Sequence, residues 1–189
     1  YAALIERVRA AETALQPGSE ALSEAVARNY FRLLAYKDEY EVARLYTSGA
    51  FLEQLGERFE GDFRLGFHLA PPLFARRNAR GELVKREYGA WMLRVFAWLA
   101  RLRWLRGSAL DPFGRTAERR MERRLIADYE ADIDRLLASL DRARLPLATR
   151  IASLPEEIRG FGHVRQRSLK AALARRQQLF DEYRAVPGM

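Results

Sequence analysis

The chain contains no cysteine, and this absence removes several kinds of chemistry at once. Without thiolates it can form no disulfide, bind no iron–sulfur cluster through sulfur and offer no cysteine nucleophile. Histidine is almost as scarce, because only His68 and His163 are present. No carboxylate stands at a spacing that would orient His68, and His163 lies alone in a glycine-flanked loop. The sequence therefore predicts no catalytic, cofactor-binding or metal-ligating residue in this chain.

The chain also lacks a long uninterrupted apolar run. Its most apolar stretch, residues 90–105, is broken by Arg94, Arg101 and Arg103, which makes it too short and too charged to span a bilayer. Residues 1–15 show the spacing of an amphipathic helix, without the basic and apolar regions of a signal peptide. We therefore expect a cytoplasmic protein with no membrane partner. Because the first residue is Tyr1, we expect the chain to be a piece of a larger protein.

Lysine is rare as well: 33 residues are basic, and all but Lys37, Lys85 and Lys170 are arginine. A coding bias towards arginine accounts for the use of arginine in place of lysine. It does not account for the uneven charge, since residues 63–115 hold 11 basic and only three acidic side chains. The excess predicts a basic patch that faces an anionic partner, made of Arg76, Arg77, Arg80, Lys85 and Arg86.

The hydrophobic pattern predicts a mainly α fold of about seven helices, with a small antiparallel β hairpin near residues 62–88, which is α+β by strict count. Apolar residues recur at helical spacing in 2–15, where Pro17 and Gly18 end the helix, and Ser19 is expected to cap the next. They alternate in 62–69, as in a half-buried strand, and 82–88 is the expected return strand. Residues 90–105 are apolar nearly all round and predict a central buried helix. We expect one domain over residues 1–189.

A second basic cluster begins the long helix predicted from Thr116. It consists of Arg119, Arg120, Arg123 and Arg124, and it lies where the helix dipole disfavours positive charge. Such a cluster indicates an acidic neighbour, and it is predicted to be a docking surface. The candidates inside the chain are Glu39, Glu41, Glu53 and Glu57; outside it, the candidate is an adjacent domain.

Five segments carry a resemblance to a known family. They are Phe31–Tyr46, Phe59–Pro72, Lys85–Met92, Asp111–Met121 and Leu154–Val164. In this order they resemble the C-terminal domain of the large fused bacterial indolepyruvate ferredoxin oxidoreductases, over about residues 25–185. The resemblance implies a parent that uses thiamine diphosphate and iron–sulfur clusters, converts aryl 2-oxoacids to acyl-CoA and reduces ferredoxin.

None of that parent chemistry maps onto residues of this chain, so the resemblance implies a non-catalytic accessory or interface domain. Its expected partners are the other domains of the parent, with ferredoxin or CoA as further candidates, and no nucleic acid. Two alternatives stay open. A basic nucleic-acid-binding module would explain the high isoelectric point, but no recognition motif appears. An independent small-molecule-binding domain would use a pocket lined by Trp91, Trp98 and Trp104.

Overall fold

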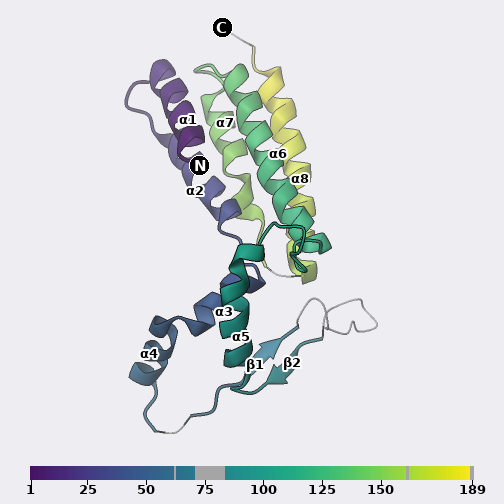
Figure 1. The fold of residues 1–189 in the computed structure, drawn as a ribbon. Helices are drawn as coiled ribbons and strands as arrows, with labels where there is room; N and C mark the ends of the chain where they lie inside the picture. Colours follow the sequence, from purple (N-terminus) through teal and green to yellow (C-terminus); the bar gives the residue numbers. More distant parts are fainter. Residues whose placement is uncertain (62, 71–83, 161, 188–189) are drawn as a thin grey trace. The chain divides into compact units, whose positions relative to one another are not determined.

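The computed structural model describes residues 1–61, 63–70, 84–160 and 162–187 of the chain. Within them lie eight α-helices, two short 3₁₀ helices and one two-stranded antiparallel sheet (Figure 1). The predicted mainly α fold with a small hairpin is therefore confirmed. The elements in chain order are α1 (Ala2–Leu15), α2 (Ala21–Leu34), α3 (Glu39–Thr47), α4 (Gly49–Arg58), β1 (Phe67–Leu69), β2 (Arg86–Tyr88), α5 (Met92–Arg101), η1 (Leu102–Leu105), α6 (Ala117–Ala138), α7 (Leu145–Ala152), η2 (Leu154–Glu157) and α8 (Gly162–Ala185).

The chain divides into two compact units, each with its own apolar core. The helical unit comprises Tyr1–Tyr36 and Glu122–Met189, and the mixed unit comprises Lys37–Met121. That the two units act as one domain stays a prediction. Among the described residues, no helix has both the length and the apolar character needed to cross a membrane.

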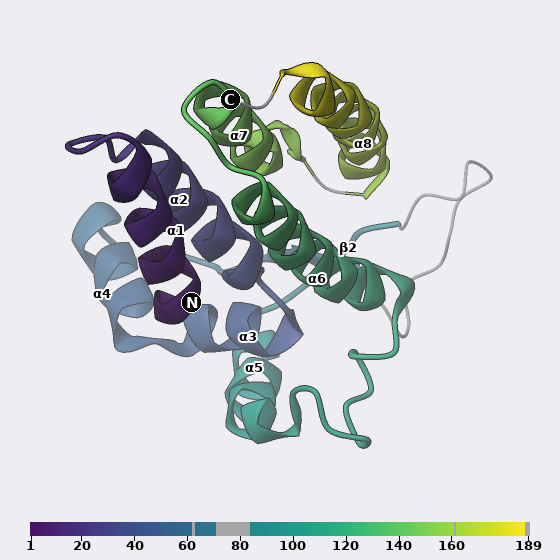
Figure 2. The same ribbon diagram turned by 90° about the horizontal axis from the view of Figure 1, so that it is seen from above.

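The core of the helical unit is formed by α1, α2, α7, α8 and most of α6, which Figure 2 shows from above. The long helix predicted from Thr116 is α6, and its apolar side chains face this core, where Tyr129, Ile133 and Leu136 are buried. They pack with residues of the other helices, among them Val8 and Leu179. Burial of several large side chains at about 1.5–3 kcal/mol each gives this unit its main stabilising term.

The turn between α1 and α2 differs from the prediction, because Ser19 does not cap α2. The fully buried Glu12 of α1 reaches across the turn instead, and its carboxylate accepts from the backbone N–H groups of Leu22 at 3.0 Å and Ser23 at 2.8 Å. The Ser19 hydroxyl donates to the same carboxylate at 2.7 Å. A residue of the preceding helix thus satisfies two of the four free N–H groups at the start of α2.

The mixed unit is built around an aromatic cluster. In the hairpin, Phe67 of β1 lies opposite Tyr88 of β2, and the Phe67 side chain is buried in the core of this unit. Its ring meets Phe96 of α5 edge-on, and Tyr46 of α3 contacts both, with all three ring centroids 5.3 Å apart. Because a two-stranded hairpin is marginal in water, this packing against α3 and α5 holds the strands. Each strand has three residues, fewer than predicted, and residues 71–83 lie outside the described part of the chain.

The prediction that residues 90–105 form a central buried helix is wrong. Helix α5 buries only Met92 and Phe96, while Trp91, Val95 and Trp98 are exposed. The buried side packs on α3 and β1. The apolar content of the segment predicts burial on all sides, but only one side of the helix has neighbours within its unit.

Candidate functional site

The mixed unit contains a cluster of buried charged and polar groups around the first turn of α3. Asp38 precedes this helix, and its carboxylate accepts the Glu41 N–H at 2.8 Å as a helix cap. The Arg106 guanidinium reaches the same carboxylate through two nitrogens, at 2.5 and 2.8 Å. This two-point geometry is the strong form of an arginine–carboxylate pair. It ties the segment after η1 to the start of α3.

Asp111 is the centre of the neighbouring loop and is almost completely buried. Its carboxylate accepts the backbone N–H groups of Gly107, Phe113 and Gly114 at 2.9–3.0 Å, and the Tyr40 hydroxyl at 3.2 Å. Both glycines are required: Gly107 has a φ of +75°, and a Cβ on Gly114 would lie 2.7 Å from the Asp111 carboxylate. The loop is therefore folded around this one side chain.

The pKa values of Asp111 and Tyr40 suit a structural role better than acid–base catalysis. Burial raises the pKa of Asp111, but the hydrogen bonds from three backbone N–H groups and from Tyr40 outweigh it and leave that pKa below its ordinary value. Burial and the nearby Asp111 charge raise the pKa of Tyr40 to about 12. Near neutral pH the carboxylate stays ionised and the phenol stays protonated. Neither pKa is matched to proton transfer at that pH.

Arg119, at the start of α6, completes the cluster. Its guanidinium contacts the Glu39 carboxylate at 3.2 and 3.3 Å and donates to the Lys37 carbonyl at 3.3 Å. Both side chains of the ion pair are largely buried. Glu39 is one of the four acidic neighbours proposed for the arginine cluster, so for Arg119 the acidic neighbour lies inside the chain. We call Asp38, Glu39, Tyr40, Arg106, Asp111 and Arg119 together the α3 polar cluster.

The other members of the predicted arginine cluster are placed differently. Arg120, Arg123 and Arg124 are exposed along α6, beyond the Arg119–Glu39 pair. In the basic patch, Lys85 and Arg86 are exposed, with Arg86 on β2 opposite Leu69. The remaining patch residues, Arg76, Arg77 and Arg80, lie outside the described residues. Both surfaces therefore stay predictions as contact sites.

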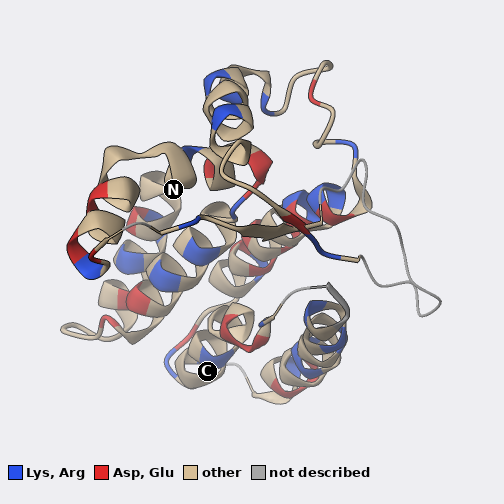
Figure 3. Cartoon of the chain, turned by 90° about the horizontal axis from the view of Figure 1, so that it is seen from below, with Lys and Arg blue, Asp and Glu red and all other residues tan. Residues whose placement is uncertain are grey.

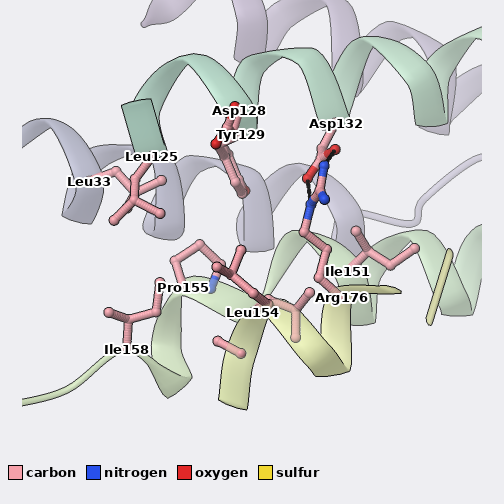
Figure 4. Close-up of a pocket in the computed structure, with 12 residues that line it drawn as sticks. Leu33, Leu125, Asp128, Tyr129, Asp132, Ile151, Leu154, Pro155, Ile158 and Arg176 are labelled. Carbon is pink, nitrogen blue, oxygen red and sulfur yellow. Dashed lines mark hydrogen bonds and ion pairs between the residues drawn. The ribbon is translucent and has the colours of Figure 1, made fainter. Parts of the chain in front are cut away.

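A small cavity in the helical unit lies between α2, α6, η2 and α8 (Figure 4). Its walls are mostly apolar, and Asp132 at its edge pairs with Arg176. The cavity measures about 50 Å³, room for one or two water molecules, whereas ligand pockets measure roughly 300–1,000 Å³. It is too small for a substrate.

A larger polar groove of about 350 Å³ lies along α7, η2 and α8 of the same unit. Its charged lining residues have both signs: Arg150, Arg159 and Arg175 are basic, and Glu156 and Glu157 are acidic. Arg159 already donates to the Glu156 carbonyl at 2.8 Å. Mixed charge of this kind gives the groove no clear preference for an anion or a cation.

The side chains singled out for other chemistry do not converge. His68 is exposed on β1, as expected for a surface histidine, and the side chain of His163 lies outside the described residues. Trp91, Trp98 and Trp104 are all more than half exposed and so do not enclose the pocket considered for them. Among the described side chains, no group of three or more possible ligands could hold a metal ion.

Sequence reasoning missed most of the α3 polar cluster. It names Glu39 as a candidate neighbour of the arginine cluster, but it singles out neither Tyr40, Arg106 nor Asp111. The available signal was local: Asp111 lies between two glycines, Gly107 and Gly114, at a spacing that suits a loop folded around a carboxylate. The partner Tyr40, 71 positions away, carries no such signal.

The fold and these contacts define a mainly helical α+β protein whose buried polar cluster holds a loop and two helix starts in place. A family of unknown function, DUF6537, matches residues 1–178, and the chain belongs to this family. No curated protein and no solved structure matches the chain.

Proposed function

We propose that this chain is a non-catalytic accessory or interface domain of a cytoplasmic indolepyruvate (aryl 2-oxoacid):ferredoxin oxidoreductase. The parent would convert a 2-oxoacid, CoA and oxidised ferredoxin to acyl-CoA, CO₂ and reduced ferredoxin. Thiamine diphosphate and iron–sulfur clusters would be held by its other domains. The chain's own role is to form contacts with those domains.

One observation carries the proposal. Two of the segments that resemble the oxidoreductase family, Phe31–Tyr46 and Asp111–Met121, supply five of the six residues of the α3 polar cluster. The polar atoms of these residues bond to one another and to nearby backbone, which suits a scaffold. The two predicted basic surfaces keep exposed side chains that suit contact with an acidic surface. These are Arg120, Arg124, Lys85 and Arg86.

The test is the native polypeptide that contains this chain, purified without oxygen. We expect visible iron–sulfur absorption, bound thiamine diphosphate, and reduction of ferredoxin that depends on indolepyruvate and CoA. The isolated 189-residue chain serves as the matched control and should be colourless and inactive. A native polypeptide with neither cofactor nor activity would exclude the proposed parent. Activity of the isolated chain would exclude the non-catalytic role.

The basic patch gives a second test within the same enzyme. Reversing the charge of Arg76, Arg77, Arg80, Lys85 and Arg86 should lower turnover with ferredoxin and CoA at low salt. Exposed charges interact over about 10 Å at 0.1 M salt. Added salt should therefore reduce the difference in turnover between the charge-reversed variant and the unmodified enzyme. Unchanged turnover at low salt would remove the patch from the proposed interface.

A further inference from the structure

Helix α5 presents an exposed face made of tryptophan, valine and arginine. Trp91, Val95 and Trp98 follow one another at intervals of four and three residues and so lie on one side of the helix. Trp98 is 72% exposed and Trp91 57% exposed. Large apolar side chains gathered on one exposed helix face mark a contact surface.

Trp91 has a ring contact within its own unit that restricts its side chain. Its ring meets that of Tyr88 on β2 edge-on, with centroids 6.0 Å apart. Tyr88 is itself half-buried against the aromatic cluster of the mixed unit. A side chain that is already ordered loses less conformational entropy when it binds. The face is therefore partly preorganised.

The sequence segment that carries this face, residues 88–110, has charged residues of a single sign, although Glu87 and Asp111 flank it directly. From Tyr88 to Leu110 the sequence has four arginines and no aspartate or glutamate. Arg94 and Arg101 flank Trp98 on the helix and are exposed, whereas Arg106 is paired with Asp38. In Figure 3 the ribbon of α5 carries the blue of lysine and arginine and none of the red of aspartate and glutamate. The complementary surface is acidic.

We propose that this α5 face, made of Trp91, Arg94, Val95, Trp98 and Arg101, docks an acidic protein surface. Tryptophan and arginine are the residues that most often dominate protein–protein binding energy. Binding to nucleic acid depends instead on many phosphate contacts, and this face offers two arginines beside an apolar centre. The inference rests on the proposed function for the expected location of the acidic surface, which is another domain of the parent.

The experiment places a photo-crosslinking phenylalanine analogue at Trp98 in the native polypeptide and identifies the crosslinked peptide by mass spectrometry. We expect a peptide rich in aspartate and glutamate, and a yield that falls as salt is raised. The matched control carries the same analogue at Leu52 of α4, an exposed apolar residue of the same unit, and should give little of this product.

Charge reversal tests whether Arg94 and Arg101 themselves attract the partner, or whether the net positive charge of the chain does so. The double variant Arg94→Glu and Arg101→Glu should lower the crosslinking yield at position 98 about tenfold or more. Arg58→Glu, an exposed arginine on α4, should leave it unchanged. If both variants reduce the yield equally, the face has no specific role and the proposal fails.

The identity of the crosslinked molecule decides the rest. An acidic peptide of a 2-oxoacid oxidoreductase supports both the docking face and the proposed function. An acidic peptide of an unrelated protein supports the docking face and contradicts the proposed function. Nucleic acid, lipid, a second copy, another part of this same chain, or no product at all overturns the docking proposal.

Discussion

Tyr40 and Asp111, 71 positions apart in the sequence, are joined by a hydrogen bond of 3.2 Å in the interior of the mixed unit. Tyr40 comes from the first turn of α3, and Asp111 is the residue around which the loop before α6 folds. The bond therefore links local order in the loop to the helix that carries the core residue Ala43.

The first prediction concerns Asp111. Asp111→Ala leaves three backbone N–H groups without their acceptor and should lower the free energy of unfolding by about 3 kcal/mol. Tyr40→Phe removes one donor and should cost about 1 kcal/mol. Urea denaturation measures both, and hydrogen exchange at Gly107, Phe113 and Gly114 should accelerate only in the alanine variant. An equal cost for the two variants would contradict the central role of the carboxylate.

The second prediction concerns the Arg119–Glu39 pair. Both side chains are largely buried, so Arg119→Ala leaves the Glu39 carboxylate without its partner and should cost about 2–3 kcal/mol. Combining it with Glu39→Ala should cost less than the sum of the single changes, by about 1–3 kcal/mol. Urea denaturation of the four proteins completes the cycle. Additive costs would show that the pair contributes no coupling.

The third prediction is a pH dependence caused by Glu12. Burial raises the pKa of this carboxyl, but hydrogen bonds from Ser23, Leu22 and Ser19 outweigh it, so the pKa lies below the ordinary value of 4.5. Its stabilising effect is therefore complete above pH 4.5 and is lost as the pH falls through the lowered pKa. Glu12→Gln should be less stable at pH 7, and should lose less stability on acidification than the unmodified chain. Thermal melts between pH 7 and about pH 3 measure this.

The fourth prediction separates the exposed arginines of α6 from Arg119. Arg120→Glu with Arg124→Glu should change the stability of the isolated chain by less than about 0.5 kcal/mol, because both side chains are exposed. The same change should weaken assembly of the parent enzyme, as measured by analytical ultracentrifugation. Arg167→Glu with Lys170→Glu on α8 is the matched control for charge. Unchanged assembly would make the Arg120 and Arg124 surface ordinary solvated surface.

The sequence predicted what depends on short-range pattern. Tyr129, Ile133 and Leu136 of α6 are an example, because helical spacing alone decides which side chains share a face. The cap that Asp38 provides is also a short-range feature, since it acts within three residues.

What the sequence could not supply was the identity of distant neighbours. Glu12 caps a helix whose bonded N–H groups lie 10 and 11 positions further on, in place of the expected Ser19. The prediction of a buried helix over residues 90–105 failed for the same reason. The apolar residues of this segment do not indicate whether another element covers them. The contact role of Arg120 and Arg124 stays a prediction, since the sequence does not identify what these side chains meet.

The confinement of all three tryptophans to residues 91–104 makes the two units optically distinct. Excitation at the red edge of tryptophan absorption reports on the mixed unit alone, whereas far-ultraviolet circular dichroism is dominated by the helices of the other. A single heating scan followed by both signals therefore measures the cooperativity between them. Coincident transitions would mean that the chain melts as one domain, and separate transitions would give each unit its own melting temperature.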